Sequence, residues 1–164
     1  MTDPDKTAWA SAKFNEDCFV IETVSGLRTQ RKDPQGSQHV LEPDSGDQAL
    51  GAALRDALAQ SRVIPPAEAS RFFHAETRKL DYADWVKAMV GRLGYDSKEA
   101  LFRKMRRCYA VARDGVLTIQ PCRHYALEGW EAHSTPAADC VTIAADAEPM
   151  AIGAALRLAF SRCR

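Results

Sequence analysis

The chain has 164 residues, 46% of them hydrophobic, and carries 22 Lys and Arg against 22 Asp and Glu. This length predicts one domain with its own core, and the balanced charge excludes an overall field that would draw the protein to nucleic acid or to an anionic membrane. Because the N-terminus lacks the basic and apolar regions of a signal peptide and no apolar stretch approaches the roughly 20 residues that span a bilayer, we expect a cytoplasmic protein.

The N-terminal residues 1–13 are polar, contain Pro4 and show no sustained hydrophobic period. Chain termini of this kind are seldom ordered unless another element holds them. We therefore predict a flexible arm, held at most by Trp9, ahead of a single globular domain over residues 14–164.

Residues 18–24 are rich in apolar and β-branched side chains, which predicts a strand. Turn residues at 25–26 and at 35–36 separate this strand from two shorter segments, 27–32 and 39–41. The three segments together predict a meander in which each strand pairs with the next.

A helix is predicted after the meander. Ser45, followed three residues later by Gln48, is typical of a capping box at a helix start. The apolar residues that follow are spaced for one helix face lying on a sheet: Leu50, Ala53, Leu54, Ala57 and Leu58.

The middle of the chain predicts connecting helices. One covers residues 67–73, a second begins with Asp81 as its cap and ends at Gly94, and Asp96 or Ser97 caps a third. The expected buried residues of this third helix and its end are Leu101, Phe102 and Met105.

The second half repeats the plan of the first. A strand over residues 108–112 precedes the hairpin turn Asp114-Gly115, and residues 116–119 return. After an irregular excursion at 122–137 comes a last strand at 141–143. A final helix, capped by Asp146, carries the apolar stripe Ile152, Ala155, Leu156, Ala159 and Phe160.

The two predicted helices contain nearly the same hexapeptide, LGAALR at 50–55 and IGAALR at 152–157. This repeat predicts the fold class: α/β of the α+β type, with a mainly antiparallel sheet built from two β-hairpin-strand-helix pseudo-repeats and connecting helices. Glycine inside a helix costs about 1 kcal/mol relative to alanine, so Gly51 and Gly153 predict close approach to a neighbouring element.

Candidate chemistry in the sequence is sparse. Cys122, His124, His133 and Cys140 are the one set that suggests zinc, but the single close pair, Cys122-x-His124, is too tight for the usual geometry. There is no nucleophile elbow, no P-loop and no H-E-x-x-H. The five widely spaced cysteines include no C-x-x-C and predict free thiols. We expect no metal, no cofactor and no catalytic residues.

Two charged segments stand out. Residues 103–107 form the densest basic run, which we interpret as the solvated outer face of an amphipathic helix and, as an alternative, as a nucleic-acid-binding face. Glu42, Asp44 and Asp47 precede the first repeated helix and form an acidic rim. Such a rim complements a helix dipole and also suits a basic protein partner.

Several segments resemble the CdiI-type immunity proteins of bacterial contact-dependent growth inhibition. They are GYDSKEALFRKM at 94–105, IGAALRLAFSRC at 152–163, residues 50–62 and Phe14-Asn15. The resemblance implies a small cytoplasmic protein that binds and blocks the C-terminal toxin domain of a CdiA effector, commonly a nuclease. On that basis Glu42, Asp44 and Asp47 are the candidate toxin-binding residues.

Two other classes stay open on the sequence. A regulatory or nucleic-acid-associated domain would use residues 103–107, and a small enzyme would use the excursion at 122–140. Salt-dependent binding of RNA or DNA would favour the first, and bound zinc or a pH-dependent activity would favour the second.

Overall fold

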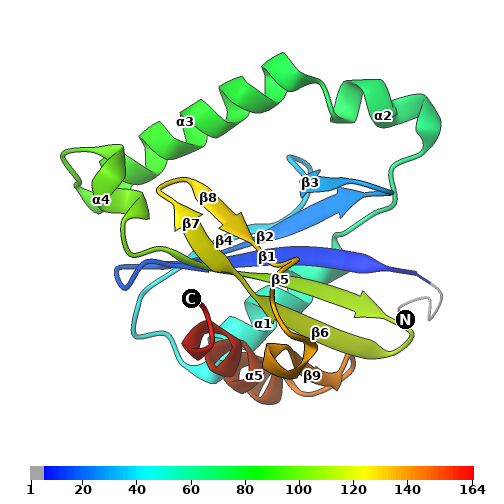
Figure 1. Cartoon of the computed structure of the whole chain (residues 1–164). Coiled ribbons are helices and arrows are strands. Elements are labelled where there is room, and N and C mark those ends of the chain that lie inside the picture. Colours follow the sequence, from blue (N-terminus) through cyan, green and yellow to red (C-terminus); the bar gives the residue numbers. More distant parts are fainter. Residues whose placement is uncertain (1–5) are drawn as a thin grey trace.

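The structure, a computed structural model, describes residues 6–164. Its centre is an antiparallel sheet with the strand order β3-β2-β1-β5-β6-β9, in which β4 also pairs with β2 (Figure 1). The strands are β1 (Ala8–Phe14), β2 (Phe19–Gly26), β3 (Gln30–Lys32), β4 (Gln38–Leu41), β5 (Arg106–Arg113), β6 (Val116–Pro121) and β9 (Val141–Ala144). Two helices, α1 (Asp47–Ala59) and α5 (Pro149–Ser161), cover one face of this sheet.

The pseudo-repeat organises the whole sheet. The hairpin β1–β2 with β4 and α1 corresponds to the hairpin β5–β6 with β9 and α5, and the two units join where β1 pairs with β5. The predicted α+β class with a mainly antiparallel sheet and two repeated units is confirmed.

The flexible arm predicted for residues 1–13 is wrong for residues 8–13, which belong to β1 at the centre of the sheet. Residues 1–5 lie outside the described part of the chain. Strand β1 carries little β-branched sequence because Ala10 and Ala12, which face α1 and α5, must be small to admit two helices packed close to the sheet. Propensity therefore missed a strand that tertiary packing imposes.

The predicted meander is also wrong. Strand β2 continues through Gly26, and both β3 and β4 pair with it, β3 opposite residues 24–26 and β4 opposite residues 19–22. Strands β3 and β4 therefore lie one after the other along the same edge of β2, and β3 does not pair with β4 as a meander requires.

Three predicted helix caps are replaced by others. Helix α1 begins after Gly46 without a side-chain cap, so the Ser45–Gln48 capping box does not form. Asp81 lies inside α3 (Ala75–Leu93), which is capped by His74, and α5 begins after Glu148 with Pro149 in its first turn, so Asp146 is not its cap. The Ser97 cap of α4 (Lys98–Phe102) and the Gly94 terminus of α3 are confirmed.

Helices α1 and α5 cross at their shared glycines. A Cβ atom added to Gly51 would overlap the backbone carbonyl of Pro149, and one added to Gly153 would overlap that of Asp47. The close approach predicted from the repeat is confirmed, and its partner is the other copy of the repeat. Below the crossing, Leu54 and Leu156 are completely buried against the sheet.

We expect Ala155→Leu to lower the free energy of unfolding by about 1–3 kcal/mol, because Ala155 is buried in the core between α5 and the sheet and a larger side chain overpacks it. Arg106→Leu, at an exposed position, should change it by less than about 0.5 kcal/mol. Equilibrium unfolding in urea measures both, and equal losses would contradict the assignment of the helix face.

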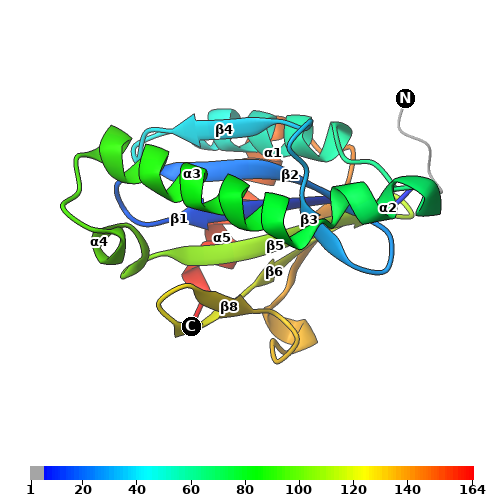
Figure 2. The same ribbon diagram turned by 90° about the horizontal axis from the view of Figure 1, so that it is seen from above.

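The opposite face of the sheet is only partly covered. Helix α2 (Pro66–Phe72) leads into α3, and a second core joins α3, α4 and the sheet through Trp85, Met89, Leu101, Phe102 and Met105. Seen from above, α3 overlies the sheet, and the small hairpin of β7 (Arg123–Ala126) and β8 (Gly129–Glu131) lies to one side (Figure 2). This hairpin and the 3-10 helix at Ala137–Asp139 account for the excursion expected at 122–137.

Candidate binding surfaces

The acidic rim lies in the turn between β4 and the start of α1. Glu42 and Asp44 are exposed there, as a contact surface requires. Asp47 is half-buried, and its carboxylate accepts from Arg157 Nε of α5 at 2.5 Å. Arg157 also donates to the backbone carbonyl of Ser45, so Asp47 fastens the two repeats together and its charge is already compensated.

A large concavity lies on the other face, between the first half of α3 and the sheet. Its volume is about 850 Å³, and its walls come from α3 and from strands β1, β3, β4 and β5. Residues 75–84 of α3 are all exposed, whereas Trp85 and Met89 are buried and anchor the second half. The first half of α3 therefore roofs the space without filling it, and we call this space the α3 cleft.

The floor of the α3 cleft carries a buried charge network. Glu22 of β2 is buried, and its carboxylate accepts from Lys13 Nζ and from Lys32 Nζ, each at 2.8 Å. Burial alone raises the pKa of Glu22, but attraction to the two lysines and their hydrogen bonds outweigh it and bring this pKa down to about 2. Burial lowers the pKa of Lys13 to about 8 against the pull of Glu22.

Aromatic rings complete this floor and hold the cations in place. Lys13 Nζ lies 4.5 Å and Lys32 Nζ 5.7 Å from the ring centroid of Trp85. The guanidinium of Arg107 lies 4.6 Å from the ring centroid of Tyr109. Two buried donors, Trp85 Nε1 and Arg107 Nε, have no hydrogen-bond partner among residues 6–164.

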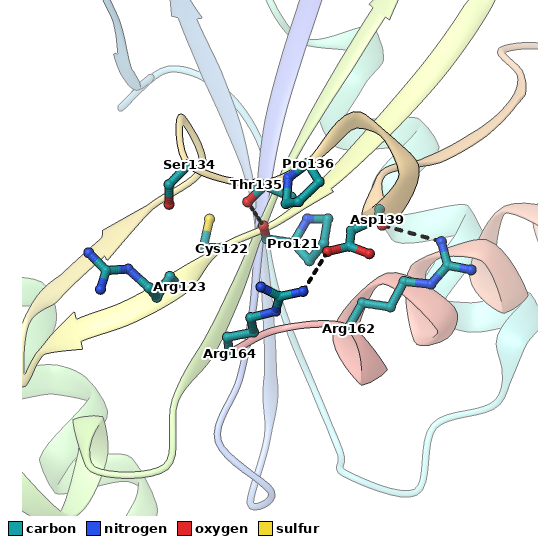
Figure 3. Close-up of a pocket in the computed structure, with 9 residues that line it drawn as sticks. All are labelled: Pro121, Cys122, Arg123, Ser134, Thr135, Pro136, Asp139, Arg162 and Arg164. Carbon is teal, nitrogen blue, oxygen red and sulfur yellow. Dashed lines mark hydrogen bonds and ion pairs between the residues drawn. The ribbon is translucent and has the colours of Figure 1, made fainter.

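A small pocket lies where the C-terminus meets the loop after β8 (Figure 3). Arg164 pairs with the Asp139 carboxylate at 3.0 Å, and Arg162 donates to the Asp139 carbonyl at 3.2 Å. The remaining space of about 30 Å³ holds little more than one water molecule, so these contacts fix the C-terminus and leave no room for a substrate.

The residues considered for zinc do not gather into a site. His124 stacks on Trp130 with ring centroids 4.7 Å apart, and His133 pairs with Glu131 at 2.8 Å. Burial raises the pKa of the Cys122 thiol to about 12, which opposes the thiolate that a metal needs. Within residues 6–164 no three His, Cys, Asp or Glu side chains are grouped to hold a metal ion.

The basic run at 103–107 is not the outer face of a helix. Helix α4 ends at Phe102, and Arg106 and Arg107 belong to β5, where alternation sends them to opposite sides of the sheet. Arg103 and Lys104 are exposed in the connection, while Leu101 and Met105 are buried as predicted. Because the run is divided between different surfaces, it forms no continuous nucleic-acid-binding face.

The residues of the α3 cleft escaped sequence analysis because they come from separate elements and share no motif. One signal was present in the sequence: Glu22 interrupts the apolar run of β2, and a carboxylate in a buried strand must find positive partners. The identity of those partners depends on strand register, which pairs Lys13 with Val20 and Val24 with Lys32.

The fold and these surfaces define a class of protein, an α+β domain whose open, charged surfaces suit a macromolecular partner. The family model of the CDI immunity protein, CdiI, matches residues 8–163. The chain is 40% identical to the immunity protein CdiI-YPIII of Yersinia pseudotuberculosis serotype O:3 (strain YPIII), over 100% of this chain and 99% of that protein. The chain belongs to the CDI immunity protein (CdiI) family.

Solved structures agree over the whole length. The protein of unknown function NMB0488 from Neisseria meningitidis has a TM-score of 0.93 at 36% identity, with 100% of this chain and 99% of that chain covered. The CdiA-CT/CdiI toxin and immunity complex from Yersinia pseudotuberculosis has a TM-score of 0.90 at 36% identity, covering 99% of this chain and 100% of that chain. Among residues 6–164, no helix is long and apolar enough to cross a membrane.

Proposed function

We propose that this protein protects its cell by binding the C-terminal toxin domain of a cognate CdiA effector and blocking it in the cytoplasm. The observation that carries the proposal is the match over the full chain to a protein solved as a toxin and immunity complex. The immunity protein acts by occupying a surface, without catalysis or cofactor. A nuclease toxin fits this role, because its basic substrate surface would be attracted to the acidic rim of the immunity protein.

The test uses the CdiA toxin domain encoded beside the gene of this protein. Co-expression should restore growth of cells that produce the toxin domain, and the purified pair should bind with 1:1 stoichiometry by calorimetry. A matched immunity protein from an unrelated system serves as the control and should give no protection. Failure of the native protein to bind or protect would overturn the proposed function.

Within this function, the acidic rim is a candidate for steering the encounter. We expect the double variant Glu42→Lys, Asp44→Lys to associate more slowly with the toxin domain at low salt. The two new lysines would repel a basic toxin surface that the native carboxylates attract, and such forces act over roughly 10 Å. Asp47 is left unchanged, since its pairing with Arg157 would confound the result. Stopped-flow association rates measure the effect.

The control for the rim carries the same change in net charge at two exposed acids away from both the rim and the α3 cleft, Asp96→Lys with Glu99→Lys. If both double variants associate equally fast, the rim is not part of the contact surface. A slower rim variant with an unchanged melting temperature would support it.

The α3 cleft is the second candidate surface, and we assign it the close contacts. Specific interfaces bury about 800 Å² on each partner, and a cleft of this size lets a segment of the partner enter and bury its surface on both sides. The rim and the cleft lie toward different faces of the sheet, so they would contact different parts of the toxin domain. The nucleic-acid alternative loses its support, because the basic run on which it depended is divided between surfaces.

A further inference from the structure

The α3 cleft has a surplus of positive charge that its own acids do not compensate. Its lining cations are Lys13, Arg31, Lys32, Arg78, Lys79 and Arg107. Its lining acids are Asp33, Asp81 and Asp84, with Glu22 beneath them. The pairing of these groups decides which cations are available to a partner.

Half of the cations are already engaged. Lys13 and Lys32 share Glu22, and Arg31 lies 3.7 Å from Asp81. Asp33 is already engaged by two residues that do not line the cleft, because Ser25 and Arg62 Nε each donate to its carboxylate at 2.8 Å. Among residues 6–164, Arg78, Lys79 and Arg107 have no ion-pair partner, and Asp84 is the one acid left opposite them.

Arg107 is the most constrained of the three free cations. Its guanidinium lies on the ring of Tyr109, and its Nε is buried without an acceptor, as is Nε1 of Trp85. Buried donors without an acceptor destabilise a protein, and a carboxylate, which accepts at both oxygens, satisfies a guanidinium best. The site therefore lacks a hydrogen-bond acceptor for these two buried donors.

The same surfaces disfavour a nucleic acid as the occupant. Single strands need open aromatic faces on which bases stack. The ring of Trp85 already receives Lys13 and Lys32, and that of Tyr109 receives Arg107. Asp81 and Asp84 would also repel a continuous phosphate backbone, whereas a protein segment can place a single carboxylate between them.

We propose, resting on the proposed immunity function, that the α3 cleft receives a carboxylate-bearing segment of the toxin domain, seated on Arg107 with Arg78 and Lys79 at the entrance. In this arrangement the three free cations determine which toxin is accepted. The exposed first half of α3 sets the position of Arg78 and Lys79 over the sheet residue Arg107, so the acceptor is held between the two layers.

The test measures affinity for the cognate toxin domain in low and in physiological salt. Arg78→Glu with Lys79→Glu should weaken binding by about tenfold or more, and Arg107→Met should do the same while keeping the length of the side chain. Arg107→Lys keeps the charge without the planar fork and should fall between. The control, Arg92→Glu with Arg103→Glu, changes exposed cations outside the cleft and should stay within about twofold.

A charge exchange gives the sharpest outcome. Each Asp and Glu of the toxin domain is changed to Lys in turn, and at least one such variant should bind the Arg78→Glu, Lys79→Glu protein better than the native toxin does. Equal binding by native and cleft-variant proteins would overturn the inference and leave the immunity function standing. If the native protein does not bind the toxin domain, both the inference and the immunity function are overturned. If the cleft variants lose binding of an RNA or DNA fragment but bind the toxin domain as the native protein does, the carboxylate assignment is overturned.

Discussion

Gly153→Ala is expected to lower the free energy of unfolding by about 3 kcal/mol, although alanine is the better helix former. The added Cβ would overlap the backbone carbonyl of Asp47, and a backbone atom cannot rotate aside as a side chain can. Helices α1 and α5 must move apart, which loosens Leu54 and Leu156 beneath the crossing. Equilibrium unfolding in guanidinium chloride measures the loss.

Gly91→Ala provides the matched control. Gly91 also lies inside a helix, but apart from the backbone of its own helix and its two chain neighbours nothing lies within 4 Å of the position that its Cβ would take. The same substitution should therefore stabilise the protein by up to about 1 kcal/mol through helix propensity. A Gly153→Ala protein that is as stable as the native one would show that the helix crossing is looser than described.

Glu22→Gln is expected to cost about 3–5 kcal/mol of stability, because it leaves Lys13 charged and buried without its partner. The amide keeps the size of the side chain, so the loss reports the charge and not a cavity. Glu128→Gln, which alters an exposed acid paired with Lys98, should cost less than about 1 kcal/mol. Similar losses from both would contradict the buried network.

The pH dependence of stability gives an independent reading of Glu22. Its folded-state pKa of about 2 lies below the ordinary value of 4.5, so its contribution is complete above pH 4.5 and is lost as the pH falls toward 2. A difference of this size corresponds to about 3 kcal/mol. The gap in stability between native protein and Glu22→Gln should therefore narrow from pH 5 to pH 2, as unfolding followed by circular dichroism would show; a constant gap would contradict the lowered pKa.

Local sequence patterns predicted elements correctly where burial enforces the pattern. The stripes of α1 and α5, the turn at Asp114-Gly115 and the Ser97 cap each depend on residues near one another in the chain. Local patterns predicted elements wrongly where residues distant in the chain determine the structure. Strand β1 is rich in small residues because two helices pack on it, and α3 begins at Ala75, well before Asp81, because the His74 side chain caps it by accepting from the Thr77 backbone N–H.

The two candidate surfaces differ in the same way: the residues of one are close in the chain, and those of the other are not. The acidic rim is contiguous in sequence and could be named from it, although only the structure assigns Asp47 to Arg157. The α3 cleft could not be named, because Lys13, Glu22, Arg78 and Arg107 come from four elements and meet only through strand register and the placement of α3. A cleft is a property of how layers are spaced, and no single segment encodes that spacing.

By itself the sequence determined the repeated strand-and-helix plan, its antiparallel sheet and the family, since the hexapeptide at 50–55 and 152–157 records both the packing face and the glycine of each helix. The tertiary structure alone decided that these glycines face each other and that β1 joins the two repeats. It also decided that the opposite face stays partly open under α3. The physical reason is that periodicity fixes which side of an element is buried, whereas the partner it is buried against depends on contacts between residues distant in the chain.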